Sequence, residues 1–317
     1  MAIMGTVIVS VDAELGWGFF DTPEPPMDRL TQSVWGWHQL CCLCDRYEIP
    51  ATWAVVGHLF LDQCDGFHYD HPLGPDRFER EQTEWASETS LRFGPSLIED
   101  LLSSDVDHEI GSHSFSHIDF ESDLVTEDVV RAEFTQFEAA VSDELSVDSF
   151  VYPRNHIQYR EILAESGMLC YRGSSPTRRR DRPVRRKVGK LWQATVTTPP
   201  LVSPTVDEYG LVNIPASLYL FGFEGYGRTI AELLGTDPVV RQAVRGIDRV
   251  ADTDKLFHLW LHPNNIMTTA DVKRLDAIWS YLASARDDRR VTIKTMGEVA
   301  REAKRDRTLA TSRTDAS

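Results

Sequence analysis

Short apolar runs alternate with longer amphipathic stretches along most of the chain, and this alternation is the strongest constraint on its fold. The first run, residues 5–12, reads Gly-Thr-Val-Ile-Val-Ser-Val-Asp and is typical of a buried strand. Residues 29–47 follow with the apolar periodicity of a helix, Pro50 ends the turn, and residues 51–56 form the next run. Strands that alternate with helices pair in parallel, so the chain is predicted to build a parallel sheet or barrel.

The pattern continues through the rest of the sequence. Further strands are expected at residues 108–112, 150–152, 169–171, 211–214, 256–261 and 291–294. Further helices are expected at residues 95–103, 126–142, 158–167, 269–284 and from 295 onward. Residues 1–303 are therefore predicted to form one domain, with insertions at 63–95 and 174–210. Residues 304–317 are polar without periodicity, and a disordered tail is expected there.

Charge and hydropathy exclude several classes of protein. The net charge of −16 over 317 residues argues against general nucleic-acid binding, which needs clustered positive charge. No run approaches the roughly 20 apolar residues that span a bilayer. The stretch from Met1 to Val11 lacks the basic region of a signal peptide, which favours a cytoplasmic protein. Because acidic residues outnumber lysines, we also hypothesise adaptation to a high-salt cytoplasm, where salt screens repulsion between carboxylates.

The five cysteines do not suggest a disulfide framework, because their number is odd and three of them are clustered. Cys41, Cys42 and Cys44 lie in an apolar helical stretch without a Cys-x-x-Cys spacing, so reduced thiols are expected there.

A second unusual segment, Arg178 to Lys190, is strongly basic and carries one acidic residue, Asp181. It fits either a solvated loop or a clamp for an anionic group, such as a sugar phosphate or an acidic glycan.

Polar residues follow several of the predicted strands at the point where each strand ends. They are Asp12 and Glu14, His113 and His117, Pro153 to Asn155, and His262 and Asn264. In parallel α/β folds the ligand site forms at the carboxyl ends of the strands, so these side chains are expected to converge. Two histidines four residues apart can reach one cation from a single helical turn.

Four sequence motifs resemble those of one family, in the same order. They read Ser10-Val-Asp-Ala-Glu14, His113-Ser-Phe-Ser-His117, Phe150-Val-Tyr-Pro-Arg-Asn155 and Leu259-Trp-Leu-His-Pro263, with smaller similarities at Pro50–Gly57 and Tyr171-Arg-Gly173. The set resembles the polysaccharide deacetylases, the chitooligosaccharide-deacetylase homology domain of carbohydrate esterase family four, over residues 5–302. The resemblance implies a distorted (β/α) barrel of about seven strand-helix units. It also implies a divalent metal ion that serves hydrolysis of a sugar N-acetyl or O-acetyl group.

The resemblance further implies roles for the first two motifs. His113 and His117 correspond to the family's metal-binding histidines, with one carboxylate completing the site. Ala13 replaces the second of two adjacent aspartates, so by analogy Asp12 is the general base and Glu14 the metal ligand. Alternation along an extended strand puts both acids on one face. The reverse assignment, with Asp12 as the ligand, stays open, as does a solvated Glu14. Zn²⁺ is the expected ion, with Co²⁺, Mn²⁺ and Ni²⁺ as alternatives.

The third and last motifs imply the remaining catalytic groups. His262 corresponds to the catalytic acid, and the main-chain N–H of Arg154 to the oxyanion donor. Val151 stands where the family carries an arginine that pairs with the base, so the Arg154 side chain could reach Asp12 or an acidic part of the substrate. His258 alternates with His262 along the strand and is expected to pack in the core or support the site.

Substrate contacts are expected from Pro153, Asn155, Trp192 and Asn264. The family's aspartate before the tryptophan is absent, so Trp192 could stack on a sugar or simply pack in the core.

The sequence thus predicts a cytoplasmic, metal-dependent hydrolase that deacetylates a carbohydrate, such as a glycan precursor. Two alternatives stay open. One is hydrolysis of another non-peptide C–N bond, as in a cyclic amide or ureide. The other is a non-catalytic glycan-binding protein, because the third and fourth motifs depart from the family pattern.

Overall fold

The computed structural model describes residues 4–176, 198–222 and 237–314, with side chains as far as residue 308. Its strands form one sheet in the order β6-β7-β5-β4-β3-β2-β1-β9-β8, with β10 also paired to β1. The strands are β1 (Gly5–Ala13), β2 (Thr52–Val55), β3 (Glu109–Ser112), β4 (Ser149–Phe150), β5 (Cys170–Gly173), β6 (Thr205–Val206), β7 (Val212–Pro215), β8 (Leu218–Tyr219), β9 (Leu256–Leu261) and β10 (Val291–Lys294). All of these pairings are parallel except that of β6 with β7.

One segment joins the two ends of this sheet. β7 pairs with β5, and β8, only two residues further along the chain, pairs with β9. Between them, the Ala216 N–H donates to the Gly173 carbonyl and the Ser217 N–H donates to the His258 carbonyl, each at 2.9 Å. The predicted distorted barrel is therefore confirmed, with β1 at its centre between β9 on one edge and β10 and β2 on the other.

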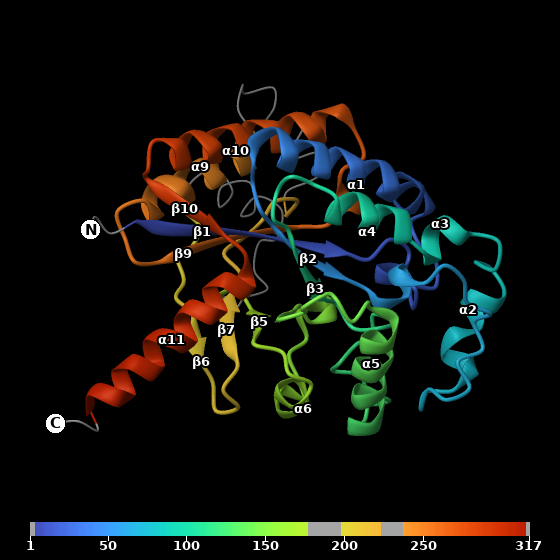
Figure 1. The fold of residues 1–317 in the computed structure, drawn as a ribbon. Coiled ribbons are helices and arrows are strands. Elements are labelled where there is room, and N and C mark those ends of the chain that lie inside the picture. The colour runs from blue at the N-terminus through green and yellow to red at the C-terminus, as the bar shows by residue number, and fades with distance from the viewer. Residues whose placement is uncertain (1–3, 177–197, 223–236, 315–317) are drawn as a thin grey trace, which may run out of the picture.

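Helices cover the outside of the curled sheet (Figure 1). They are α1 (Met27–Tyr47), α4 (Pro95–Leu102), α5 (Glu127–Ala140), α6 (Arg160–Glu165), α9 (Pro238–Val250) and α10 (Thr269–Asp287). A further helix, α11 (Met296–Thr314), packs its first turn against the apolar end of the barrel interior. Local sequence explains where two of them begin. Thr126 caps α5 as predicted, and Thr268 forms a capping box with Asp271 at the start of α10.

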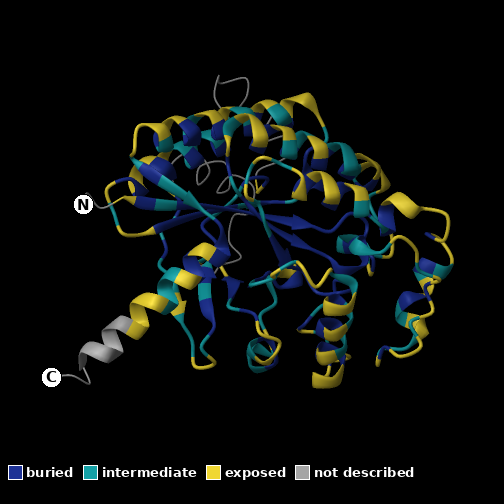
Figure 2. Ribbon diagram, viewed as in Figure 1, coloured by how far each residue is buried: buried dark blue, intermediate teal, exposed yellow. Residues whose placement is uncertain are grey.

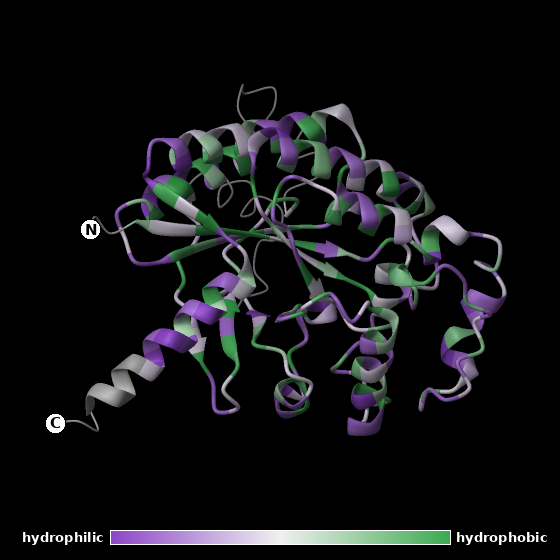
Figure 3. Cartoon of the chain, in the orientation of Figure 1, coloured by the Kyte–Doolittle hydropathy of each residue, from purple (hydrophilic) through white to green (hydrophobic). Residues whose placement is uncertain are grey.

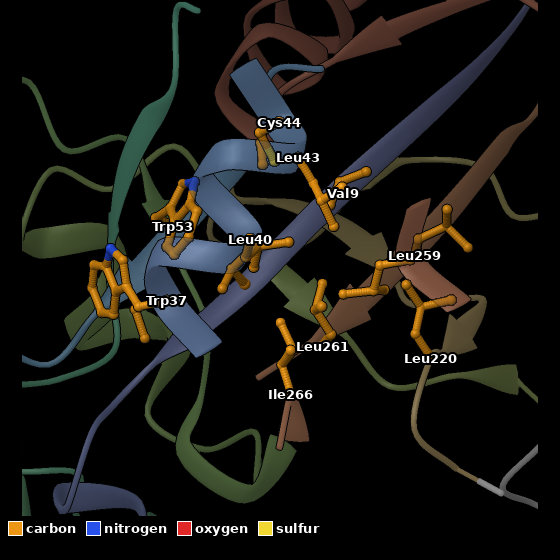
Figure 4. Close-up of a cluster of buried hydrophobic side chains, with 14 of the residues drawn as sticks. Val9, Trp37, Leu40, Leu43, Cys44, Trp53, Leu220, Leu259, Leu261 and Ile266 are labelled. Carbon is orange, nitrogen blue, oxygen red and sulfur yellow. The ribbon is translucent and has the colours of Figure 1, made fainter. Parts of the chain in front are cut away.

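The alternation of β1 divides its side chains between two environments. Val7, Val9 and Val11 belong to the large cluster that packs the sheet against α1, α9 and α10. Figure 4 shows Val9 in this cluster, near side chains of α1 and β9. The strands are buried and hydrophobic along most of their length, whereas the helices expose polar outer faces (Figures 2 and 3).

The opposite face of β1 points into the barrel, where apolar side chains fill one end. Ile8 packs there with Ala54, Val151 and Ile214, and with Met296 and Val299 of α11. Further along the same face of β1 come Ser10 and Asp12, which are polar and buried. The barrel interior thus changes from apolar to polar toward the carboxyl ends of the strands, and this change positions the site.

One sequence expectation differs from the structure. Residues 304–314 continue α11 rather than forming a disordered tail, because the segment holds good helix formers and no glycine or proline. The predicted insertion at 63–95 contains α2 (Glu79–Gln82) and α3 (Thr89–Arg92) and buries Phe78 and Trp85. Within the described residues, every helix is too short or too polar to cross a membrane.

Candidate functional site

The carboxyl ends of β1, β3 and β9 bring five of the predicted side chains around one pocket of about 290 Å³. They are Asp12, Glu14, His113, His117 and His262. The pocket is also lined by Trp260 and Tyr219, two aromatic side chains that the sequence did not indicate as site residues. The convergence predicted from the strand ends is therefore present in the structure.

Glu14 lies against both histidines of the second motif. Its Oε2 is 3.1 Å from Nε2 of His117 and 3.6 Å from Nε2 of His113, and all three side chains are buried. Burial alone would raise the pKa of Glu14, but the neighbouring His262, His113 and His117 lower it well below its ordinary value. Glu14 is thus an ionised, buried carboxylate and not a solvated loop residue.

Glu14 is fixed from two further sides. Asn264 donates from Nδ2 to Glu14 Oε1 at 3.1 Å, and Arg29 holds the Asn264 side chain by donating to Oδ1 at 3.2 Å. Gly18 packs so closely on the carboxylate that a Cβ there would lie 2.1 Å from Oε1.

His113 presents an unprotonated nitrogen toward Glu14. Nδ1 of His113 lies 2.6 Å from the Val151 carbonyl, and only a protonated nitrogen can face a carbonyl oxygen. The proton of the neutral ring is therefore on Nδ1, and Nε2 keeps its lone pair. That Nε2 is buried and has no hydrogen-bond partner among the described residues. Burial also lowers the pKa of His117, which favours its neutral form.

A buried carboxylate on α5 holds the loop between these histidines. Glu133 Oε2 accepts the main-chain N–H groups of Phe115 and Ser116, both at 2.8 Å. The loop is tight, with positive φ angles at Ser114 (62°) and His117 (54°). Two imidazoles and one carboxylate, prepositioned so that their ligand atoms converge, match the ligand set of a catalytic metal site.

Asp12 lies beside this cluster but pairs with a different residue, Arg172 of β5. The two guanidinium nitrogens of Arg172 donate to the two carboxylate oxygens of Asp12 at 2.5 and 2.7 Å, with both side chains buried. Burial would raise the pKa of Asp12, but Arg172, His262 and His113 bring it below its ordinary value. Asp12 is therefore held ionised and in one orientation.

Arg172 was missed in the sequence as a site residue. It also donates to Asn155 Oδ1 at 3.1 and 3.2 Å and to Ser10 Oγ at 3.2 Å, and its guanidinium lies 4.3 Å from the Trp260 ring. A signal was present, because strand alternation puts Arg172 on the same face as Cys170, inside the barrel.

His262 stands across the pocket from the metal-type cluster. Its Nε2 is 3.5 Å from Asp12 Oδ2 and 3.8 Å from Glu14 Oε1, and its side chain is 20% exposed. Tyr219 donates its hydroxyl proton to Asn265 at 2.6 Å, so at 3.3 Å it can only accept from His262 Nδ1. Nδ1 thus keeps its proton, and Nε2 is the nitrogen that faces Asp12 and Glu14 in the pocket.

The other predicted residues are placed less directly. The Arg154 guanidinium pairs with Asp21 at 2.5 Å, so the expectation that it reaches Asp12 is wrong: Arg172 already occupies both oxygens of Asp12. Asn155 and Asn264 line the pocket, yet their side chains hold Arg172 and Glu14. Pro153 is buried and begins a short 3-10 helix.

Trp192 and the basic segment Arg178–Lys190 lie outside the described residues. His258 is buried and contacts Ser10 Oγ at 2.9 Å, as expected for a supporting residue.

Comparison with solved structures identifies the fold. A candidate polysaccharide deacetylase from Mycobacterium smegmatis superposes with a TM-score of 0.60 at 15% identity, over 97% of this chain and 92% of that one. A candidate polysaccharide deacetylase from Pseudomonas aeruginosa PAO1 gives a TM-score of 0.56 at 14% identity, over 93% and 89% of the two chains. The Puue allantoinase gives the same TM-score, identity and coverage.

These likenesses show that the chain has the polysaccharide-deacetylase fold, as the motif resemblance predicted. No protein-family model matches the sequence, and no curated protein sequence matches it.

Proposed function

We propose that the protein is a metal-dependent hydrolase that removes an N-acetyl or O-acetyl group from a carbohydrate. The observation that carries the proposal is the pairing of two sets of buried groups at one pocket. Glu14, His113 and His117 offer a metal-type ligand set, and the Asp12–Arg172 pair and His262 stand beside it. The shared fold with candidate polysaccharide deacetylases supports the assignment.

Glu14, His113 and His117 are the residues that would hold the ion. A divalent ion bound there supplies Lewis-acid polarisation of the acetyl carbonyl and a water molecule of lowered pKa. Two imidazole nitrogens and one carboxylate oxygen suit Zn²⁺, and Co²⁺, Mn²⁺ and Ni²⁺ are accepted by similar ligands. We assign Glu14 rather than Asp12 as the ligand, because Asp12 already gives both oxygens to Arg172.

The remaining groups divide the acid–base work. Asp12 takes a proton from the attacking water, and Arg172 keeps its carboxylate ionised and oriented for that step. The main-chain N–H of Arg154 donates to the oxyanion of the tetrahedral intermediate. His262 then protonates the leaving nitrogen or oxygen from Nε2, since its Nδ1 proton is engaged by Tyr219.

The pocket walls favour a sugar as substrate. Trp260 and Tyr219 pack together with ring centroids 4.3 Å apart and ring planes tilted by 30°, and both line the pocket beside His262. Aromatic faces pack well on the apolar faces of sugar rings. We propose an acetylated glycan precursor as the substrate class, with the basic segment Arg178–Lys190 as the candidate clamp for an anionic group on it.

A second candidate activity is hydrolysis of a cyclic ureide. It is favoured by the match to the Puue allantoinase, which is as strong as one of the deacetylase matches. Opening a ureide ring needs the same water activation and the same protonation of a leaving nitrogen, but it releases no acetate.

One assay separates these functions from each other and from a glycan-binding role. The protein is incubated with a panel of N- and O-acetylated sugars and with allantoin, with and without chelator. We expect acetate release that chelator abolishes and that zinc restores. Ring opening of allantoin without acetate release would favour the ureide activity. Turnover of no compound, together with binding of glycans, would replace both enzymatic proposals.

His113→Ala and His117→Ala are expected to lose acetate release, and Cys42→Ser on the exposed face of α1 is the matched control. Substitution of the arginines in Arg178–Lys190 by glutamine tests the clamp. If the clamp exists, this variant loses activity on anionic substrates and keeps its activity on neutral ones.

A further inference from the structure

A second cluster of metal-type side chains lies where the insertion folds back on the barrel. It consists of His58, Cys64, His68 and Glu81. His58 belongs to a short 3-10 helix (Gly57–Phe60) directly after β2, and Glu81 lies on α2. Cys64 and His68 come from the connecting loop between these elements. All four ligand atoms lie within 4.8 Å of one another.

The distances between the ligand atoms are close to those of a tetrahedral site. His68 Nε2 lies 3.1 Å from His58 Nε2, 3.3 Å from Cys64 Sγ and 2.9 Å from Glu81 Oε2. His58 Nε2 lies 3.6 Å from Glu81 Oε2. A tetrahedral zinc ion with bonds of roughly 2.0–2.3 Å holds its ligand atoms about 3.3–3.7 Å apart. The shortest contact, 2.9 Å between His68 Nε2 and Glu81 Oε2, lengthens by roughly 0.4 Å to reach this range.

Hydrogen bonding does not account for this convergence. One imidazole nitrogen, His68 Nε2, has three close polar neighbours, yet a single nitrogen carries at most one proton. If the proton on His68 Nε2 is donated to Glu81, none is left for the contacts of the same nitrogen with His58 Nε2 and Cys64 Sγ. A cation at the centre satisfies all four atoms at once. Cys64 as thiolate and Glu81 as carboxylate would also balance the charge of a divalent ion.

Three of the four ligands are oriented by a further contact, as is usual around protein metal sites. Arg92 donates to the other oxygen of Glu81 at 2.6 and 3.2 Å, and the Gly66 N–H donates to Cys64 Sγ at 3.4 Å. His58 Nδ1 lies 3.1 Å from the Phe115 carbonyl, so its proton is on Nδ1 and Nε2 is free to bind an ion.

We propose that His58, Cys64, His68 and Glu81 bind a structural zinc ion, separate from the candidate hydrolytic site. Four protein ligands, one of them a thiolate, leave no open position for a substrate. The ion fastens the insertion to the end of β2, where Trp17 stacks on His58 at 3.9 Å between ring centroids. The zinc site is connected to the candidate active site by the contact of His58 with the Phe115 carbonyl, because Phe115 lies midway between His113 and His117 in the sequence.

Cobalt substitution tests this site independently of any activity. The purified protein is stripped with chelator and titrated with Co²⁺, and its absorption spectrum is recorded. Cys64 is the only sulfur ligand in either cluster, so a thiolate-to-cobalt charge-transfer band reports this site alone. We expect the band at one equivalent of bound cobalt, its loss in Cys64→Ser, and its retention in Cys42→Ser and His113→Ala.

Absence of the band in cobalt-loaded wild-type protein would overturn the proposal, and so would its persistence in Cys64→Ser. The wild-type spectrum decides the matter even if Cys64→Ser does not fold. Cys64→Asp provides a second variant that keeps an anionic ligand and is expected to bind cobalt without the band. Failure of the proposed deacetylase activity would leave the charge-transfer result unaffected.

Discussion

At the scale of single residues, Arg172 and Asp12 form an ion pair at the candidate functional site. The pair is buried, and replacing one member leaves the other as an uncompensated charge. We expect Arg172→Met to lower the free energy of unfolding by about 3–5 kcal/mol. The variant should also raise the pKa of Asp12, so that the acidic limb of the activity profile moves to higher pH. Denaturant titration and a pH–rate profile measure the two effects.

Arg160→Met is the matched control, because Arg160 pairs with Asp207 and Glu208 near the surface. It is expected to cost at most about 1 kcal/mol. An Arg172→Met protein with an unchanged pH profile would contradict the positioning role of Arg172.

His108 gives the chain a pH-dependent stability away from the pocket. Burial lowers the pKa of His108 to about 4, and its Nδ1 accepts the Ala51 N–H at 3.2 Å. Protonation therefore favours the unfolded chain, where the pKa is 6.5. This contribution to stability is complete above pH 6.5 and is lost as pH falls toward 4.

His108→Asn keeps an acceptor oxygen near the Nδ1 position but cannot titrate. Between pH 7 and pH 5, we expect the variant to lose about 1–2 kcal/mol less unfolding free energy than the wild type. Parallel loss in the two proteins, measured by urea titration at each pH, would exclude His108 as a source.

Single residues also show what sequence could and could not reveal. Asp12, Glu14, His113, His117 and His262 were found because each follows a strand within a recognisable motif. The Asp12–Arg172 pair was missed because it joins β1 to β5 across the barrel, and pairing across 160 positions leaves no local pattern. The cluster of His58, Cys64, His68 and Glu81 was also missed, because the spacing of these residues is not that of a common metal-binding motif.

At the scale of elements, α5 supports the metal-type site through Glu133. This carboxylate accepts two N–H groups of the His113–His117 loop and lies 3.2 Å from Nε2 of His71 in the insertion. In Glu133→Gln, one carboxylate oxygen becomes an NH2 group that cannot accept a hydrogen bond, and the negative charge is lost. We expect metal affinity at the candidate active site to fall by about tenfold, as for other outer contacts of metal ligands.

Competition with a chelating indicator measures this affinity. Glu138→Gln, on the exposed side of the same helix, is expected to leave it unchanged. Equal affinities in the two variants would show that α5 does not support the loop.

Element boundaries were predictable where local chemistry sets them. Thr126 and the start of α5 were found because an N-cap is a local signal. The joining of the sheet by β7 and β8 was not predicted, because β8 is two residues long and its pairing depends on the distant β9. The extension of α11 was also missed. Its last turns run past the barrel, so they need no apolar face, and the sequence there shows no helical apolar periodicity.

At the scale of the whole molecule, the net charge of −16 governs the response to salt. Repulsion among surface carboxylates destabilises the compact state, and salt screens that repulsion. We expect the melting temperature to rise as KCl increases from low to molar concentration. A melting temperature that falls steadily over this range would contradict the proposed adaptation to high salt.

The fold as a whole follows from the alternation of strands and helices, which predicts a parallel sheet or barrel, while the distorted barrel itself was implied by the motif resemblance. The site follows from the fold, because the barrel interior changes from apolar to polar along β1 and exposes its charged residues at the carboxyl ends. What connects these levels is the claim that Glu14 binds a metal ion while Asp12 acts as the base.

Metal content after dialysis, determined by mass spectrometry together with acetate release, tests that claim most directly. Glu14→Gln is predicted to contain one zinc ion fewer per chain than the wild type and to be inactive. Asp12→Asn is predicted to keep the full wild-type zinc content and also to be inactive. Full zinc content in Glu14→Gln, or loss of an ion in Asp12→Asn alone, would contradict the account.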